Sequence, residues 1–170
     1  MPPKNQRWWL TTDSQETVIR APAERVYDLV ADLTRMGDWS DECARVEWVD
    51  GATGPAVGAR FVGHNRTGPR GLIKWSRRGR VLVAERGREF AFATEEGGNE
   101  GVVWRYRFEP VDGATRVTES YEVTSIPAWA RILDVPTNRH RALLRSMQHT
   151  LARLKAAAEK PALEPHRSLP

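Results

Sequence analysis

Residues 137–158 carry the clearest hydrophobic pattern of the chain. Apolar side chains recur there every three or four positions, and arginine and lysine occupy the opposite side. The apolar positions are Leu143, Leu144, Met147, Leu151, Leu154 and Ala158. Pro136 precedes the pattern and Pro161 follows it, and proline does not continue a helix. The pattern predicts a long amphipathic helix with one face against a core and the other face in water.

Shorter patterns near the N-terminus predict a strand followed by two short helices. Apolar and polar residues alternate over residues 13–20, which is typical of a strand. Pro22 suits the first turn of a helix. The expected buried stripe of this helix is Val26, Leu29, Val30 and Leu33. Thr34 is a suitable cap for a second helical turn over residues 35–39.

Strand-like runs separated by turn residues occupy the middle of the chain. The runs are 45–49, 59–66, 72–85, 88–95, 102–110 and 115–124. Their hairpin spacing predicts antiparallel neighbours. The order of elements predicts an α+β fold, in which a curved antiparallel sheet of about six to seven strands wraps around the long C-terminal helix, with two short helices after strand one. We expect an N-terminal arm at 1–12, one domain at 13–158 and a disordered tail at 159–170.

The cysteine content and the hydrophobic run lengths indicate a compartment. Cys43 is the one cysteine among 170 residues, so the chain cannot form an internal disulfide, which favours a reducing environment. No run approaches the roughly 18 apolar residues of a membrane span, and the N-terminus lacks a secretory apolar segment. These features predict a cytoplasmic protein with no integral membrane segment.

Basic residues gather in one part of the chain, although the formal net charge is only +4. The fifteen residues from 66 to 80 contain no acid, and their basic residues are Arg66, Arg70, Lys74, Arg77, Arg78 and Arg80. Such a run can meet phosphate or an anionic membrane. The sequence favours a simpler interpretation, a solvated edge strand that its charges protect against pairing with another molecule. No nucleic-acid-binding motif accompanies the run, so we expect no nucleic-acid partner.

Four stretches carry a resemblance to a known family. They are IRAPAERVYDLVADLTRMGDWS, VGARFVGHNRTG, VWRYRFEP and GATRVTESYEV. Together with the order of elements, they resemble the SRPBCC superfamily of START-like, helix-grip proteins, and within it the polyketide cyclase/dehydrase and lipid-transport group. The resemblance covers roughly residues 13–157 and implies a cavity between the concave sheet and the long helix. It does not select an activity, because the family includes aromatase/cyclases, lipid carriers and hormone receptors.

Strand alternation predicts which residues face that cavity. Glu119 shares the apolar side of its strand with Tyr121, and Arg77 shares that of Trp75 unless a bulge at Gly79 shifts the phase. The predicted ligand-binding residues are Trp39, Asn65, Trp75, Arg77, Phe92, Thr94, Trp104, Tyr106, Glu119, Tyr121, His140 and Met147. A mostly apolar surface with a few polar groups is what a small-molecule site requires.

The candidate residues also have structural explanations. Arg77 and Glu119 pair with each other in one interpretation and face a ligand in the other, and the sequence favours neither. His140 is more simply a hydrogen-bonded helix residue, and Trp39 an aromatic residue that caps the core. Cys43 is expected to be a buried thiol rather than a nucleophile, because no histidine is adjacent in sequence.

The motifs of several common chemistries are missing from the sequence. We find no glycine-rich phosphate loop after a strand, no GxSxG elbow and no HExxH motif. The four histidines and the one cysteine have no metal-ligand spacing. We therefore expect no metal and no cofactor.

These observations favour the binding of a hydrophobic or aromatic small molecule, such as a polyketide, lipid or isoprenoid, by a monomer or homodimer. The first alternative is a cofactor-free polyketide cyclase, aromatase or dehydratase, which the family resemblance permits. In that case Arg77 would stabilise an enolate, and Glu119, Tyr121 or His140 would move protons. The second alternative is a protein-interaction module whose basic residues dock an acidic protein.

Overall fold

The computed structural model describes residues 12–67, 71–96, 98–124 and 139–160, without the side chains of Thr67, Glu96, Arg139 and His140. The elements are β1 (Thr12–Ile19), α1 (Ala23–Ala31), the 3-10 helix η1 (Leu33–Arg35), α2 (Met36–Trp39), β2 (Cys43–Val49), β3 (Arg60–Thr67), β4 (Ile73–Glu85), β5 (Glu89–Glu96), β6 (Asn99–Val111), β7 (Ala114–Val123) and α4 (Arg139–Ala158). The predicted order of strand, short helices, meander and long helix is confirmed.

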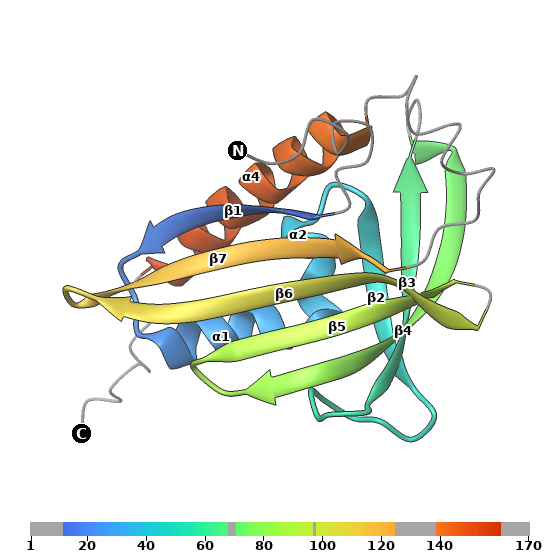
Figure 1. The fold of residues 1–170 in the computed structure, drawn as a ribbon, viewed down its shortest axis with the longest axis horizontal. Helices are drawn as coiled ribbons and strands as arrows, with labels where there is room; N and C mark the ends of the chain where they lie inside the picture. Colours follow the sequence, from blue (N-terminus) through green and yellow to red (C-terminus); the bar gives the residue numbers. More distant parts are fainter. Residues whose placement is uncertain (1–11, 68–70, 97, 125–138, 161–170) are drawn as a thin grey trace, which may run out of the picture.

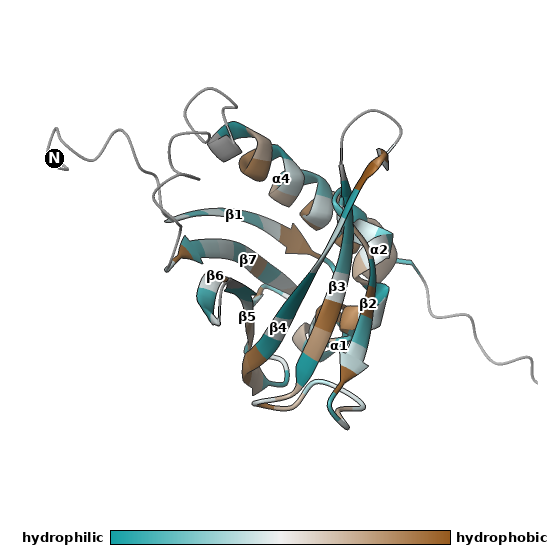
Figure 2. Ribbon diagram, turned by 90° about the vertical axis from the view of Figure 1, so that its right-hand side faces the viewer, coloured by the Kyte–Doolittle hydropathy of each residue, from teal (hydrophilic) through white to brown (hydrophobic). Residues whose placement is uncertain are grey.

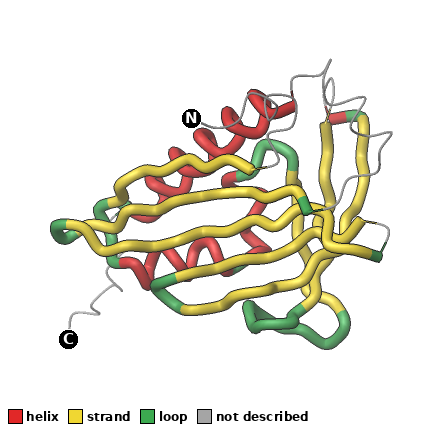
Figure 3. The backbone as a smooth tube through the Cα atoms, in the orientation of Figure 1, coloured by secondary structure: helices red, strands yellow, loops and turns green. Residues whose placement is uncertain are grey.

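The strands form one seven-stranded antiparallel sheet in the order β1-β7-β6-β5-β4-β3-β2 (Figure 1). Strands β2 to β7 follow one another as a meander joined by loops (Figure 3). The chain begins the sheet at one edge with β1, passes through the short helices, and starts the meander at the opposite edge with β2. This connection forces the sheet to bend around the helices that link its two edges.

The helices lie inside the bend of the sheet. Figure 2 shows β1 and β7 on the left of the view and β2 and β3 on the right, and α1 contacts β5, β6 and β7. The helix α4 packs against β1, α1 and α2, and to a lesser extent against β7. Its predicted apolar stripe is buried at Met147, Leu151, Leu154 and Ala158. The hydrophobic effect therefore holds α4 in place, at about 1.5–3 kcal/mol for each fully buried large side chain.

Aromatic rings fill the core at the α1 end of the sheet. Tyr27 of α1 meets Phe90 and Phe108 edge-on, with ring centroids 6.0 and 5.7 Å apart. Farther across the sheet, Phe61 and Phe92 make another edge-on contact at 5.5 Å. Such pairs add about 0.5–1.5 kcal/mol each to the burial of the rings. This end of the molecule is therefore closed by packed side chains.

The basic segment does not form an edge strand, so that prediction is wrong. Strand β4 lies between β5 and β3, and β3 lies between β4 and β2. Two arginines of the basic segment form ion pairs with acidic residues of neighbouring segments. Arg78 pairs with Asp50 at 2.8 Å, and Arg80 pairs with Glu100 at 2.7 Å. The charges of this stretch therefore extend across the outer face of a paired sheet.

Local details of two other predictions differ from the structure. Thr34 does not cap the second helical turn, because the N-cap position of α2 is Arg35 and no side chain caps it. The backbone N–H of Thr34 donates instead to Oδ1 of Asp32, which caps η1. The predicted arm begins outside the described residues, and its last residue, Thr12, already belongs to β1. Of the predicted tail, residues 161–170 lie outside the description. No helix in the described ranges is long and apolar enough to cross a membrane.

Candidate functional site

Glu119 is a carboxyl group in the buried interior of the protein. Strand alternation places it on the inner face of β7, and its side chain is 3% exposed. Tyr106 lies directly opposite on β6, and its hydroxyl donates to Oε1 of Glu119 at 2.8 Å. The other oxygen, Oε2, is buried and has no hydrogen-bond partner among the residues that the structure describes. The pair thus leaves one polar atom of the interior unsatisfied.

Burial changes the acid–base properties of both groups. Loss of water raises the pKa of Glu119 to about 8, although the hydrogen bond from Tyr106 acts in the opposite direction. Burial also raises the pKa of Tyr106, and the neighbouring carboxyl adds to that effect. Near neutral pH, the Glu119 side chain is therefore mostly a neutral carboxylic acid. A neutral carboxylic acid can donate one hydrogen bond as well as accept one.

Two further aromatic residues and a contact to α4 surround this pair. Tyr121 and Trp104 lie opposite each other in the next row of the same strands, with ring centroids 5.7 Å apart. On the other side of β7, Gln15 of β1 lies opposite Glu119 and accepts a hydrogen bond from Gln148 of α4 at 3.2 Å. The site thus has an aromatic side toward β6 and a polar link to the helix above it.

A second polar group lies on the inner face of β3 and β4. Asn65 lies opposite Trp75, and Arg77 lies opposite Gly63, with all three side chains half-buried. The register runs unbroken through Gly79, and the bulge of β4 comes later, at Val81/Val83. Arg77 therefore lies on the same side of β4 as Trp75 and Gly79.

The proposed ion pair between Arg77 and Glu119 is absent, so that structural alternative is wrong. Tyr106 is the partner of Oε1, and Oε2 has no partner in the described part of the chain. The strands β5 and β6 separate the two residues. Three strand spacings amount to about 14 Å along a flat sheet.

Three other predicted ligand-binding residues have structural partners. The hydroxyl of Thr94 donates to the carbonyl of Val102 and accepts from its N–H, both at 3.3 Å, beside a bulge of β5. Phe92 belongs to the aromatic core described above. Trp39 is buried in α2, with the guanidinium of Arg35 4.9 Å from its ring centroid. These contacts explain the three residues without a ligand.

The remaining predicted residues are placed as follows. Met147 is buried on the inner face of α4. His140 is the second residue of that helix, and its side chain lies outside the described residues. Cys43 is a half-buried thiol, and burial raises its pKa to about 11, so little thiolate forms near neutral pH. No cluster of three or more potential metal ligands occurs in the described ranges.

The outer face of the sheet carries a serine, a histidine and a glutamate in contact. Nδ1 of His64 lies 2.9 Å from the hydroxyl of Ser76, and its Nε2 lies 2.8 Å from Oε1 of Glu47. These residue types serve nucleophilic catalysis elsewhere, but such catalysis also needs N–H donors for the developing oxyanion. Here the neighbouring N–H groups bond within the ladder of β2, β3 and β4. We therefore interpret the group as a polar cross-strand network.

Two surface hollows lie away from Glu119. One is lined by the start of α1, the β4–β5 turn and the β6–β7 turn. The other is lined by the loop between β2 and β3. Neither includes a predicted ligand-binding residue. The internal cavity expected from the family resemblance therefore stays a prediction.

The curved seven-stranded sheet, the short helices after β1 and the long C-terminal helix define a helix-grip protein. The sequence model of the family described as "Polyketide cyclase / dehydrase and lipid transport" matches residues 11–159. The chain therefore belongs to that family. No curated protein sequence shows a significant match to it.

Several solved structures share this fold. The polyketide-cyclase-like protein Cgl2372 from Corynebacterium glutamicum is 33% identical, with a TM-score of 0.60 over 94% of this chain and 98% of that chain. Protein Ms6760 from Mycobacterium smegmatis is 20% identical, with a TM-score of 0.60 over 86% and 90% of the two chains. The di-domain ARO/CYC StfQ from the steffimycin biosynthetic pathway is 15% identical, with a TM-score of 0.71 over 91% of this chain and 52% of that chain. This chain thus corresponds to about half of StfQ.

Proposed function

We propose that the protein binds an apolar or aromatic small molecule, such as a polyketide, lipid or isoprenoid, that carries a hydrogen-bond acceptor such as a carbonyl group. The ligand would lie against the inner face of the sheet, with its acceptor at Glu119. The observation that carries this proposal is the buried Oε2 atom, which has no partner among the described residues. Leaving such an atom unpaired costs about 1–3 kcal/mol, and a ligand oxygen would recover that cost.

The geometry of the carboxyl group supports an acceptor on the ligand. Because the Tyr106 hydroxyl donates to Oε1, that oxygen acts as the acceptor of the neutral carboxylic acid. The proton of the acid then resides on Oε2, which becomes a donor. A carbonyl oxygen matches this donor, whereas an ammonium group cannot accept a hydrogen bond from it.

Apolar surface would supply most of the affinity. Trp104 and Tyr121 lie in the row next to Glu119, and Met147 is buried on α4. Burying apolar ligand surface contributes about 25 cal/mol per Å², from which the cost of association must be subtracted. A few hundred square ångströms would therefore give affinities of about micromolar. Within this proposal, Asn65, Trp75 and Arg77 contact the far end of a longer ligand.

A matched pair of probes tests the acceptor requirement. 2-Acetylnaphthalene and 2-isopropylnaphthalene share a ring and a side group of similar shape, but only the first has a carbonyl. We expect the wild-type protein to bind the acetyl compound about 5–10-fold more tightly, the effect of one net hydrogen bond. Titration calorimetry or tryptophan fluorescence measures both dissociation constants.

Two variants of Glu119 separate the donor role from a charged role. Glu119→Gln keeps a donor and an acceptor, so it should keep the preference for the acetyl compound. Glu119→Leu keeps the apolar volume but has no donor, so it should bind both probes equally. The proposal fails if neither probe binds, or if the leucine variant, shown to be folded by circular dichroism, retains the preference.

A second candidate function is proton-transfer catalysis on a polyketide-like substrate by the same carboxyl group. The pKa of about 8 at Glu119 favours it, because a general acid works best when its pKa lies near the working pH. Glutamine can donate a hydrogen bond but cannot transfer a proton. An enzyme would therefore lose turnover of a poly-β-ketone thioester in Glu119→Gln while keeping ligand affinity. A binding protein would show no turnover in either form.

A further inference from the structure

Two neighbouring apolar side chains are exposed at the end of the β3–β4 hairpin. Leu72 is 75% exposed and Ile73 is 59% exposed. They lie where the chain enters β4, far along the sheet from the loop that joins β2 to β3. Figure 2 shows this hydrophobic tip above a hydrophilic stretch of the same hairpin. Two adjacent apolar side chains in water at a projecting tip indicate a surface that meets something apolar.

Cationic side chains lie directly behind this tip. Arg66 and Lys74 are opposite each other across β3 and β4, and neither has an ion pair among the described residues. Like charges directly opposite each other destabilise a sheet unless an anion lies between or beside them. A Cβ atom added at Gly71 would be 3.2 Å from Cδ of Arg66, so the arginine stem extends along the tip. Arg78, by contrast, pairs with Asp50.

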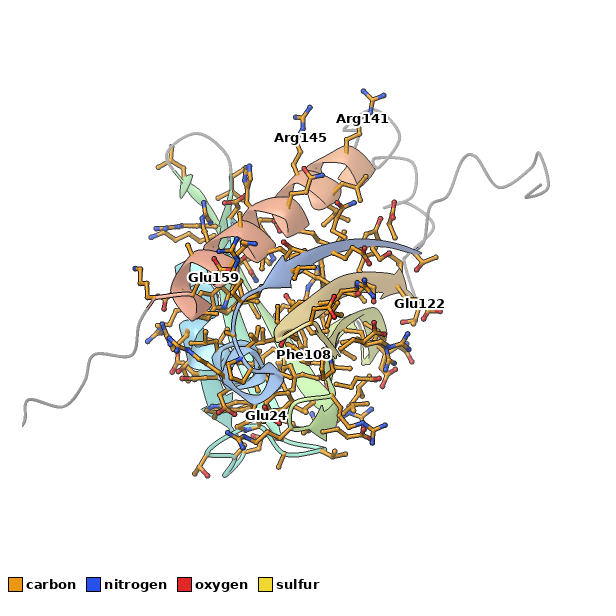
Figure 4. The ribbon with its side chains drawn as sticks, turned by 90° about the vertical axis from the view of Figure 1, so that its left-hand side faces the viewer. Glu24, Phe108, Glu122, Arg141, Arg145 and Glu159 are labelled. Carbon is orange, nitrogen blue, oxygen red and sulfur yellow. The ribbon has the colours of Figure 1, made fainter. Side chains whose placement is uncertain are left out.

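The beginning of α4 adds two more cations at the same end of the molecule. Arg141 and Arg145 point away from the body of the protein (Figure 4). Neither has an ion pair in the part of the chain that the structure describes, whereas Arg153 and Lys155 farther along α4 pair with Asp41 and Glu159. Figures 1 and 2 show the start of α4 and the hairpin tip toward the top of the view, and Figure 2 shows them on opposite sides of it. Two basic side chains thus lie beside the apolar tip, and two more lie at the start of α4, toward the same end of the molecule.

We propose that this end of the protein docks on an anionic lipid bilayer. Leu72 and Ile73 would enter the interface between headgroups and acyl chains, and the four basic side chains would contact the lipid phosphates. A bilayer offers both chemistries at the required depths, an anionic surface above an apolar layer. Nucleic acid would leave the two apolar side chains without a partner. The proposal is independent of the ligand proposed for Glu119.

Vesicle sedimentation of the full chain tests this proposal. The probes are vesicles of phosphatidylcholine alone and vesicles that contain about one third phosphatidylglycerol, at about 0.1 M salt. We expect at least about 25-fold stronger partitioning onto the anionic vesicles, since each basic side chain near such a surface contributes about fivefold. Leu72→Ser combined with Ile73→Ser should weaken binding about tenfold or more. Arg66→Gln combined with Lys74→Gln should weaken it about 25-fold.

Control variants match these changes in chemistry but lie elsewhere. Val57→Ser removes another exposed apolar side chain, 70% exposed, in the loop at the opposite end of β3. Arg88→Gln combined with Arg107→Gln removes two exposed charges near the β4–β5 turn. Both controls should stay within about twofold of the wild type, because distant charges are screened.

Four outcomes would overturn the proposal. The first is equal binding of the wild type to both kinds of vesicle or to neither. The second is wild-type affinity in the tip variant, which would show that charge alone attracts the protein. The third is equal weakening by the controls, which would show that net charge and not this end of the molecule determines binding. Retention of the wild type by an acidic protein or by heparin, without vesicle binding, would point to a different partner and also overturn it.

Discussion

A carboxylic acid among aromatic side chains is the most informative single residue of this protein. Glu119 is buried on the inner face of β7 and receives one hydrogen bond, from Tyr106. The buried position disfavours the carboxylate, and a single neutral donor does not compensate for the lost water. The residue is therefore mostly protonated near neutral pH. Its contribution to stability then depends on pH in a direction opposite to that of most paired carboxylates.

Glu119 should make the protein less stable as pH rises from about 5 to 8. The ordinary pKa of a glutamate, 4.5, applies to the unfolded chain, whereas the pKa of Glu119 in the folded protein is about 8. Between these two pH values the folded state therefore binds one proton more than the unfolded state. The stabilising contribution is fully present below the unfolded pKa and is lost as pH rises through the folded pKa. We expect the free energy of unfolding to fall by about 1.4 kcal/mol per pH unit from this residue. Urea unfolding followed by tryptophan fluorescence measures it.

Glu119→Gln is the matched control, because the amide keeps the shape and does not titrate. Its free energy of unfolding should change much less than that of the wild type over the same interval. The acids whose pKa is lowered in the fold, such as Asp28 beside Arg86, titrate below this window and do not interfere. Parallel pH profiles for the two proteins would contradict the raised pKa of Glu119.

At the level of elements, the hairpin of β6 and β7 shows how much the sequence alone could predict. Asp112 and Gly113 form its two-residue turn with positive φ angles of 47° and 76°, as the Asp-Gly pair indicates. Counting outward from this turn pairs Val111 with Ala114, and by the same count Tyr106 with Glu119. The sequence predicts the strands, the long helix and, for the strands β3 to β7, the side that faces inward. The same count predicts the Tyr106–Glu119 contact, whereas the alternation of β6 alone predicts Tyr106 only as an inward-facing aromatic residue.

Other features depend on contacts between elements that are distant in sequence. The position of the basic segment within the sheet follows from pairings across whole strands, which a local pattern does not encode. The sequence indicates a possible bulge at Gly79. In the structure, the missing side chain of Gly79 leaves the space that the ring of Phe61 from β3 occupies. Arg77 and Glu119 likewise do not pair because the strands β5 and β6 lie between them. The periodicity of a strand predicts on which face of the sheet a side chain lies. Which residue of another strand it contacts depends on how the strands pair.

Gly79→Ala should destabilise the packing between β3, β4 and β5. A Cβ atom there would be 2.3 Å from Cζ of Phe61 and 2.8 Å from the carbonyl oxygen of Ala93. The ring must move, and overpacking of this kind costs about 1–3 kcal/mol. Chemical denaturation gives the change in unfolding free energy. Adding Phe61→Leu should recover part of the loss, because it removes the closer of the two contacts.

Gly54→Ala provides the control for this substitution. A Cβ atom at Gly54 would have open space around it, so the change should stay within about 0.5 kcal/mol of the wild type. An equal effect of the two substitutions would mean that loss of backbone freedom, and not contact with Phe61, determines the outcome.

At the scale of the whole molecule, α4 is attached in two different ways. Its apolar side packs into the core through residues such as Leu154, which is fully buried. Its polar side reaches the segment between α2 and β2, where Asp41 bonds to His149 at 2.9 Å and to Arg153 at 2.8 Å. Burial acts to raise the pKa of Asp41, but these two hydrogen bonds outweigh it and lower the pKa. The apolar contacts of α4 are buried, whereas its ion pairs with Asp41 are partly exposed to water.

Leu154→Ala should therefore destabilise the protein far more than Asp41→Ala. The first substitution leaves a cavity in the core and costs about 2–5 kcal/mol. The second removes two partly exposed ion pairs, which water and salt already weaken, so its cost should stay below about 1 kcal/mol. Guanidinium unfolding compares the unfolding free energies of the two variants. In urea, added salt should reduce the difference in unfolding free energy between the wild type and Asp41→Ala, and it should leave that of Leu154→Ala unchanged. If Asp41→Ala costs as much as Leu154→Ala, then the polar contacts and not the apolar stripe position α4 over Glu119, and its placement would vary with pH and ionic strength.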